Sequence, residues 1–514
     1  MIFMKQIKYI GRILVVIAAI TFSSCTNNFL AEIKPETAQD VYSLRYSIDD
    51  LDVLTNGAYG ALFSPTGMGS FQGCMEYQSD FFYAEPSLKS AWVTGRDGNA
   101  YTHSYSNKDY DLQAQVMQWN NMAINLVNVA IESLDQGMVD KDPKKATDGD
   151  RVMGEAKFIR AYAHWQFAVM LGAQYHSSTL ALPCGVYRTK AILGLSDIPK
   201  GISTVGEMYN LIIADLKEAQ AKLPVSFDAT KHPSKYLVGV RQDAATALLA
   251  KIYFQMNDFD KALAEIEKLL GAVSATGSVK YPLASNYNDL FGLMGNQNYG
   301  PNLGKEMIYG AEGASAQKWT LDSKWGFYRH TRPLKDSKGV TVAQAYGRLR
   351  LGIPYINLLD QVKDKRFTQL VEKVGTNYWQ KKFALSSANV PIFRAAEFHL
   401  IRAEILARKD QSANAVSELN LTRVRAGLDA YVYTTKAALL KEIVDERGRE
   451  MVCEIVRHLD NLRLGAIDGT PIPLGQRDSD DKVFIGGVDA LPWNSPFFVY
   501  PMPQNEKDYN DALK

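Results

Sequence analysis

The sequence is poor in cysteine, and neither sign of charge is in excess. Four cysteines among 514 residues are too few for a disulfide framework, and none belongs to a CxxC pair that would indicate metal or redox chemistry. Lys and Arg number 57 against 56 Asp and Glu, without a basic cluster, so we expect no nucleic-acid partner. The 46% hydrophobic content is typical of a globular chain and argues against disorder.

The short motifs of the common enzyme classes are also absent. The sequence contains no GxxxxGK[ST] phosphate loop, no HExxH helix, no GxSxG elbow and no GxGxxG turn. Its seven histidines include no pair spaced four residues apart, as a helical metal site would require. We therefore expect a protein that is not an enzyme, with no catalytic residue, no cofactor and no metal. The carboxylate pair of a glycosidase is the one pattern that a sequence leaves open.

The first 25 residues have the pattern of an export signal. Three cations and no acid precede Ile13–Ile20, an apolar run much shorter than the roughly 20 residues that a membrane-spanning helix needs. The segment Phe22-Ser23-Ser24-Cys25 resembles a bacterial lipobox, in which the cysteine is acylated and becomes the first residue. We therefore predict a signal peptide over 1–24, lipidation of Cys25, and an extended tether over 25–45.

The remainder of the chain, 46–514, is predicted to be a single, mostly α-helical domain. Apolar residues recur at helical spacing in many segments, whereas alternating stretches long enough for a large sheet are few. The predicted helices cover 48–63, 113–134, 154–171, 205–222, 241–256, 259–270, 393–408, 412–425 and 436–464.

Two of the predicted helix pairs, 241–270 and 394–421, are similar to each other. Each has a short polar turn in the middle, and each has alanines twelve residues apart: Ala250 and Ala262, Ala403 and Ala415. Small residues at these positions allow two helices to approach closely, as in tetratricopeptide repeats. Such pairs need neighbours to cover their apolar faces, so we expect further helices to complete a stack.

Long polar segments rich in aromatic residues separate the helices, chiefly at 64–111 and 272–392. Aromatic faces pack against the C–H face of a sugar ring, and neighbouring Asn, Asp and Arg groups can hydrogen-bond its hydroxyls. Loops of this length are usually functional. The predicted ligand-binding residues are Tyr83, Trp92, Arg96, Asp97, Asn99, Tyr101, Tyr287, Trp319, Trp325 and Tyr328.

Three stretches resemble the SusD/RagB family of outer-membrane lipoproteins. Gly154–Ala161, with the sequence GEAKFIRA, is similar to the first conserved helix of that family. Glu446–Glu454, with the sequence ERGREMVCE, is similar to its arginine-rich C-terminal helix, and Tyr500–Glu506 to its closing segment. The sequence differs from the family pattern after Glu454, where Ile455-Val456-Arg457-His458 stands in place of the usual Gly-His-Arg-Trp.

The charges of the arginine-rich segment suggest a structural lattice. Glu446, Glu450 and Glu454 are four residues apart and would repel one another on a helix unless cations lie between them. Because ion-paired carboxylates stay ionised, they are poor general acids. We expect this lattice to hold the C-terminal helix against the repeats.

The resemblance implies a SusD-like fold and a role in nutrient uptake. It implies a surface lipoprotein, anchored through Cys25 in the outer membrane, that binds oligosaccharide through the loops of 64–111 and 272–392. It further implies a SusC-like TonB-dependent barrel as the partner that receives the ligand. Two alternatives stay open: a peptide-uptake lipoprotein of the RagB type, and a helical-repeat scaffold that binds only proteins.

Overall fold

The computed structural model describes most of the chain after the predicted tether. The described residues are 46–64, 66–84, 100, 111–139, 148–291, 305–311, 334–335, 341–343, 349–382, 390–474 and 489–513. Those from Ser47 onward form one compact unit. Among the described residues, no helix combines the length and the apolar character needed to cross a membrane. The predicted signal peptide and the lipidation site Cys25 lie outside the described residues.

Most of the predicted helices are present, with ends within a few residues of the prediction. The main ones are α3 (Ile48–Leu62), α7 (Leu112–Asp135), α8 (Asp148–Leu171), α9 (Val205–Lys222), α10 (Gln242–Gln255), α11 (Phe259–Leu270), α15 (Ala395–Arg408) and α16 (Ser412–Arg425). Capping boxes begin two of them. Ser47 and Asp50 satisfy each other's backbone N–H groups at the start of α3, and Thr204 and Glu207 do the same at α9.

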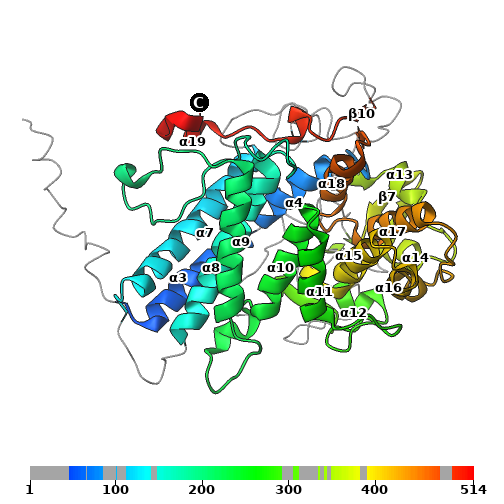
Figure 1. Ribbon diagram of the computed structural model, residues 1–514, viewed down its shortest axis with the longest axis horizontal. Coiled ribbons are helices and arrows are strands. Elements are labelled where there is room, and N and C mark those ends of the chain that lie inside the picture. Colours follow the sequence, from blue (N-terminus) through cyan, green and yellow to red (C-terminus); the bar gives the residue numbers. More distant parts are fainter. Residues whose placement is uncertain are drawn as a thin grey trace, which may run out of the picture. The chain divides into compact units, whose positions relative to one another are not determined.

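These helices pack in chain order as a stack of pairs (Figure 1). α10 and α11 are joined by a three-residue turn, as are α15 and α16, and α11 also contacts α15. Ala250, Ala262, Ala403 and Ala415 are fully buried, which confirms the close approach predicted from their spacing. Both turns contain a left-handed Asn or Asp, Asn257 at φ 61° and Asp410 at φ 62°. The mostly α fold with repeat-like pairs is therefore confirmed.

The segment 64–111, predicted to be a loop, contains a helix. α4 (Met68–Tyr77) has the sequence MGSFQGCMEY, and all ten of its residues are buried. A helix buried on every side has no polar face and shows no amphipathic period, so its apolar spacing does not reveal it. The prediction of an irregular connection was wrong for this stretch.

The single helix predicted over 436–464 is broken into two. α17 (Lys436–Met451) and α18 (Arg457–Asp468) flank a turn in which Cys453 and Ile455 adopt φ values of 66° and 61°. Left-handed backbone is unusual for a β-branched residue, with a cost on the order of 1–3 kcal/mol. Ile455 stands where the family motif usually has glycine, which adopts this conformation freely. Glu454 consequently lies outside both helices, and the prediction of one continuous helix was wrong here.

Short antiparallel ribbons complete the fold. The pairs are β1 (Phe82–Ala84) with β5 (Leu349–Leu351), β2 (Met307–Ala311) with β8 (Val390–Arg394), β3 (Leu334–Lys335) with β4 (Thr341–Ala343), β6 (Val371–Val374) with β7 (Asn377–Gln380), and β9 (Ile472–Pro473) with β10 (Ala490–Leu491). Short helices lie between the strands, namely α12 (Tyr287–Phe291), α13 (Ile353–Ile356) and α14 (Lys365–Leu370), and α19 (Gln504–Tyr509) follows the last strand. Part of the segment 272–392, predicted to be irregular, is therefore ordered into these elements.

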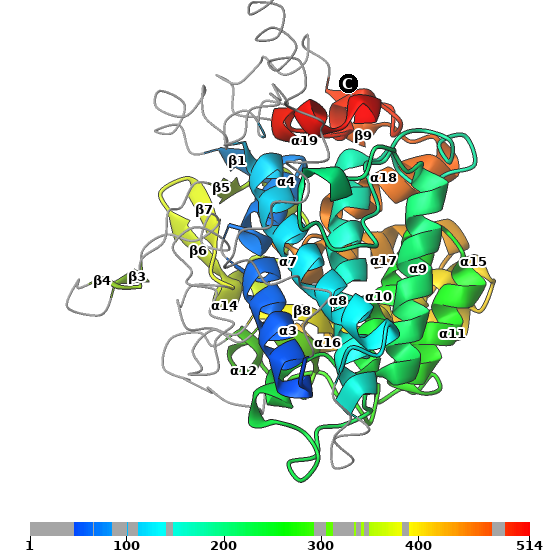
Figure 2. The ribbon, with the colours of Figure 1, turned by 90° about the vertical axis from the view of Figure 1, so that its left-hand side faces the viewer.

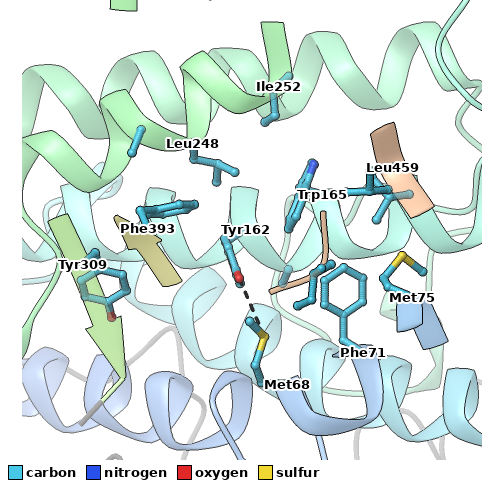
Figure 3. Close-up of a cluster of buried hydrophobic side chains, with 14 of the residues drawn as sticks. Met68, Phe71, Met75, Tyr162, Trp165, Leu248, Ile252, Tyr309, Phe393 and Leu459 are labelled. Atoms are coloured by element: carbon cyan, nitrogen blue, oxygen red, sulfur yellow. Dashed lines mark hydrogen bonds between the residues drawn. The ribbon is translucent and has the colours of Figure 1, made fainter. Parts of the chain in front are cut away.

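An aromatic core joins α4 to the helix stack (Figure 3). Trp165 and Tyr162 of α8 lie between Phe71 of α4 on one side and Leu248 of α10 on the other. The ring centroids of Phe71 and Trp165 are 5.7 Å apart in an edge-to-face arrangement, and those of Tyr162 and Trp165 are 5.5 Å apart. α4 is thereby part of the interior.

Candidate functional site

Each of the two aromatic loop regions has one end at the β1–β5 ribbon, although the stretch 312–333 itself follows β2. Ala84, the last residue of β1, pairs with Leu349, the first residue of β5. The chain therefore leaves β1 toward residues 85–99 and enters β5 from residues 344–348 at the same end of the ribbon. Figure 2 shows β1, β5, β6 and β7 together at one side of the helices. One chain end of each loop region is thus fixed at a common edge.

A polar cluster lies on this ribbon. Tyr83 of β1 pairs across the ladder with Arg350 of β5, and both side chains are largely buried. The Tyr83 hydroxyl accepts a hydrogen bond from the backbone N–H of Ile353 at 3.3 Å. The Arg350 guanidinium donates to Oδ1 of Asn377, on the neighbouring β7. We refer to Tyr83, Arg350 and Asn377 as the ribbon cluster.

Of the predicted ligand-binding residues, the structure describes two, Tyr83 and Tyr287. The others lie outside the described residues: Trp92, Arg96, Asp97, Asn99, Tyr101, Trp319, Trp325 and Tyr328. Tyr83 is in the ribbon cluster, with 8% of its surface exposed. The structure brings it to the point from which the loop carrying Trp92 leaves the body.

Tyr287 has different surroundings. Its side chain is 1% exposed, and its hydroxyl donates to Oε2 of Glu450 at 2.9 Å. The Arg425 guanidinium lies over its ring, 4.8 Å from the centroid. These contacts make Tyr287 a member of the interior in the described structure, where its ring has no face open to a sugar.

Glu450 is the centre of a buried ion network. Its Oε1 atom accepts from Arg394 at 2.6 Å and from Arg425, and its Oε2 atom accepts from Arg366 at 3.3 Å. Burial by itself raises the pKa of Glu450, but the attraction of Arg425, Arg394 and Arg366 outweighs it and holds that pKa far below the usual range. The carboxylate is therefore permanently charged, which is unsuitable for an acid catalyst and suitable for a structural ion.

The network ties strands and loop ends to α17. Glu454 accepts from Lys382 at 2.6 Å and from Arg394 at 2.7 Å, and Glu446 accepts from Arg366 at 2.7 Å. Arg394 also donates to Glu306, beside β2, at 2.9 Å. Lys382 and Glu306 adjoin chain segments that lead into the long loop region.

Two further ion pairs hold α18, one to the repeat helix α15 and one to α17. Arg463 of α18 donates through both terminal nitrogens to Glu404 of α15, at 2.9 and 2.8 Å. Arg447 of α17 donates to Asp460 of α18 at 2.8 Å. The predicted structural role of the lattice is confirmed by these contacts, although most of the partners of its glutamates come from other segments.

Residues of the first conserved stretch are packing and pairing residues. A Cβ atom added to Gly154 would lie 3.0 Å from the backbone nitrogen of Leu223, so glycine allows the end of α9 to lie against α8. Arg160 donates to both oxygens of Asp215 on α9, at 2.6 and 2.8 Å. This part of the motif therefore preserves the fold and adds no chemistry to the site.

Glu76 of α4 accepts a hydrogen bond at 3.0 Å from the backbone N–H of Ile455, in the strained turn. Burial raises the pKa of Glu76 to about 8, and nearby Glu454 adds to the effect of burial while Lys382 opposes it. Below about pH 8 the folded protein keeps this proton, whereas the unfolded chain releases it above about pH 4.5. Wild-type stability should therefore fall between these two pH values.

We expect the Glu76→Gln variant to lack this loss, because glutamine retains the acceptor oxygen and does not titrate. Urea unfolding should show similar stability for wild type and variant at pH 4.5. At pH 9 the variant should be more stable by an amount on the order of a few kcal/mol. A difference between the two proteins that is the same at both pH values would contradict this assignment.

Sequence reasoning missed Arg350, Lys382, Arg394 and Asn377. The β6–β7 hairpin had a usable signal, because Gly375-Thr376 separates two short stretches with Val, Tyr and Trp, and the φ of 60° at Gly375 suits a tight turn. Arg350, Lys382 and Arg394 gave no such signal in the sequence, because their hydrogen-bond partners are tens of residues away along the chain.

Comparison with known proteins gives a consistent assignment. The model of the SusD family matches residues 307–514, and a related model described as "Starch-binding associating with outer membrane" matches residues 36–254. Among curated proteins, none matches this sequence.

Solved structures with the same fold come from several Bacteroides species. A SusD superfamily protein from Bacteroides thetaiotaomicron matches with a TM-score of 0.75 and 17% identity, covering 91% of this chain and 99% of its own. A putative sugar binding protein from Bacteroides vulgatus matches with a TM-score of 0.72 and 21% identity, covering 91% and 97%. Surface glycan-binding protein A from Bacteroides uniformis matches with a TM-score of 0.69 and 18% identity, covering 91% and 98%.

The stacked helix pairs define a protein with the SusD-like fold. The two family models lie on either side of residues 255–306 and match most of the chain. The chain belongs to the SusD/RagB family.

Proposed function

We propose that this protein is an outer-membrane lipoprotein that binds oligosaccharide and delivers it to a SusC-like TonB-dependent barrel, without catalysis. Membership of the family supports this proposal, as does the description of the model that matches residues 36–254. Structural relatives are described as sugar-binding, glycan-binding or laminarin-binding proteins. Acyl groups on Cys25 would hold the body at the membrane.

The observation that carries the proposal is that each loop region has one end at the same ribbon. Ala84 and Leu349 are cross-strand partners, so the segment that holds Trp92 begins where the chain of the second region returns to β5. A binding surface for a sugar needs aromatic faces and hydrogen-bonding groups within the span of a few rings. Side chains scattered over the sequence, including Trp92 and Trp319, can meet that requirement only if their loops converge.

We expect Trp92→Ala and Trp319→Ala each to weaken oligosaccharide binding about tenfold or more, because each removes an aromatic face that packs on a sugar ring. Isothermal titration calorimetry against a panel of glycans measures this. Tyr433→Ala serves as the control, since Tyr433 is 45% exposed and lies outside the two loop regions.

Three results would contradict the proposal. Binding of peptides with no response to any glycan would favour the RagB type of uptake protein. Capture of proteins alone, without a barrel or a glycan, would favour a repeat scaffold. Release of reducing ends from a bound glycan by purified protein would show an enzyme.

A further inference from the structure

We propose that Asn377 contacts the ligand, donating from its carboxamide to the sugar hydroxyls, and that Arg350 is the positioning residue that orients it. This inference rests on the proposed function and adds the β6–β7 hairpin to the site. The predicted aromatic residues of the second loop region lie between 287 and 328, whereas Asn377 belongs to an ordered hairpin later in the same region.

The two faces of the β6–β7 hairpin differ. Lys373 pairs with Tyr378, and their side chains meet on one face, with Nζ 5.3 Å from the ring centroid. Val374 pairs with Asn377, so these side chains lie on the opposite face. The Asn377 side chain is hydrogen-bonded to Arg350, so this second face of the hairpin lies toward β5.

The orientation of the Asn377 amide follows from its partner. A guanidinium has only donors, so the atom that meets it must be the carbonyl oxygen Oδ1. Nδ2, with two N–H groups, then points away from Arg350. Among the described residues it donates to no protein acceptor, and the side chain is half-buried, so solvent or a ligand can reach it.

The chemistry of this position suits a neutral, hydroxyl-rich ligand. Arg350 itself is 4% exposed and already engaged by Asn377, so it offers no free charge to an anionic ligand. Asn377 offers two donors fixed in direction, and the oxygen lone pairs of a sugar hydroxyl accept such bonds. Since Arg350 is adjacent to Leu349, the donors lie close to the edge at which each loop region has one end. A pre-oriented donor also loses little conformational entropy on binding.

The Asn377→Asp variant separates this role from a structural one. The carboxylate still accepts from Arg350 and gains a charge pairing with it, so the melting temperature should stay the same or rise. The two N–H donors disappear, so affinity for the glycan that wild type binds should fall about tenfold, measured by calorimetry. Asn377→Ala, which removes the donors without adding a charge, should weaken binding to a similar extent.

Lys373→Ala is the matched control, because it changes an exposed residue of the same hairpin on the other face. It should leave affinity unchanged. For the positioning role, Arg350→Gln should weaken binding, and the additional Asn377→Asp change should then have little further effect, because the amide is no longer oriented.

The outcomes separate this inference from the function on which it rests. If wild type binds a glycan and Asn377→Asp binds it equally well, the inference fails and the proposed function stands. If glycan affinity falls by the same factor in Asn377→Asp and in Lys373→Ala, the hairpin affects binding only through its folded structure, and the inference also fails. If wild type binds no glycan, the proposed function fails, and the inference fails with it.

Discussion

Replacing Glu450 with glutamine should lower the free energy of unfolding by about 3–5 kcal/mol, because three buried guanidinium groups lose their shared countercharge. Arg394, Arg425 and Arg366 all donate to this carboxylate, whose side chain is fully buried. A neutral amide would leave their charges uncompensated and would place its own NH₂ group against donors. The Tyr287 hydroxyl would also lose a charged acceptor. Urea unfolding followed by circular dichroism measures the difference.

Glu442→Gln is the control on the same helix. Glu442 also pairs with two arginines, Arg423 and Arg449, but its side chain is 21% exposed. Solvent screens such a pair, so the loss should stay below about 1 kcal/mol. If both variants lose the same free energy of unfolding, burial does not explain the contribution of the Glu450 network to stability.

The second large effect is expected for Trp165→Ala, which should also cost about 3–5 kcal/mol through the cavity it leaves. Trp165 lies between α4 and α10, with Phe71 at 5.7 Å, Tyr162 at 5.5 Å and the Lys251 ammonium 5.8 Å from its ring (Figure 3). Its indole N–H donates to Gln255 at 3.3 Å. The cavity would lie where α4 meets the helix stack.

Trp165→Phe is the conservative comparison, since it keeps most of the aromatic volume and removes the indole hydrogen bond. We expect its loss to be well under half that of the alanine variant. Trp493→Ala, at a partly buried position, should cost less than Trp165→Ala. If the three variants lose similar stability, the aromatic cluster is not the main contact of α4.

The main helices could be predicted from the sequence because their signals are local. A surface helix repeats its apolar residues every three or four positions, and α9, α11 and α16 began and ended where this pattern did. The paired alanines were informative for the same reason, because helix packing demands small residues at a fixed spacing. The family, too, could be named from short stretches of contiguous residues.

The prediction failed where contacts between distant segments decide the structure. α4 carries no period because it is buried on all sides. The break at Ile455 reflects a turn that Glu76 and Lys382 hold through bonds to the backbone. Tyr287 was predicted to face a ligand because of its polar neighbours in the sequence, whereas its partners in space are Glu450 and Arg425.

By itself the sequence determined the helix-pair architecture, and it predicts an export signal with Cys25 and two regions in which a ligand site should lie. Only the tertiary structure decided that each region has one end at the same ribbon, and that Arg350 and Asn377 meet beside it. The physical reason is the range of the interactions. Helical period and capping act over a few residues, whereas strand pairing and buried ion pairs join residues that the chain separates by tens to hundreds of positions.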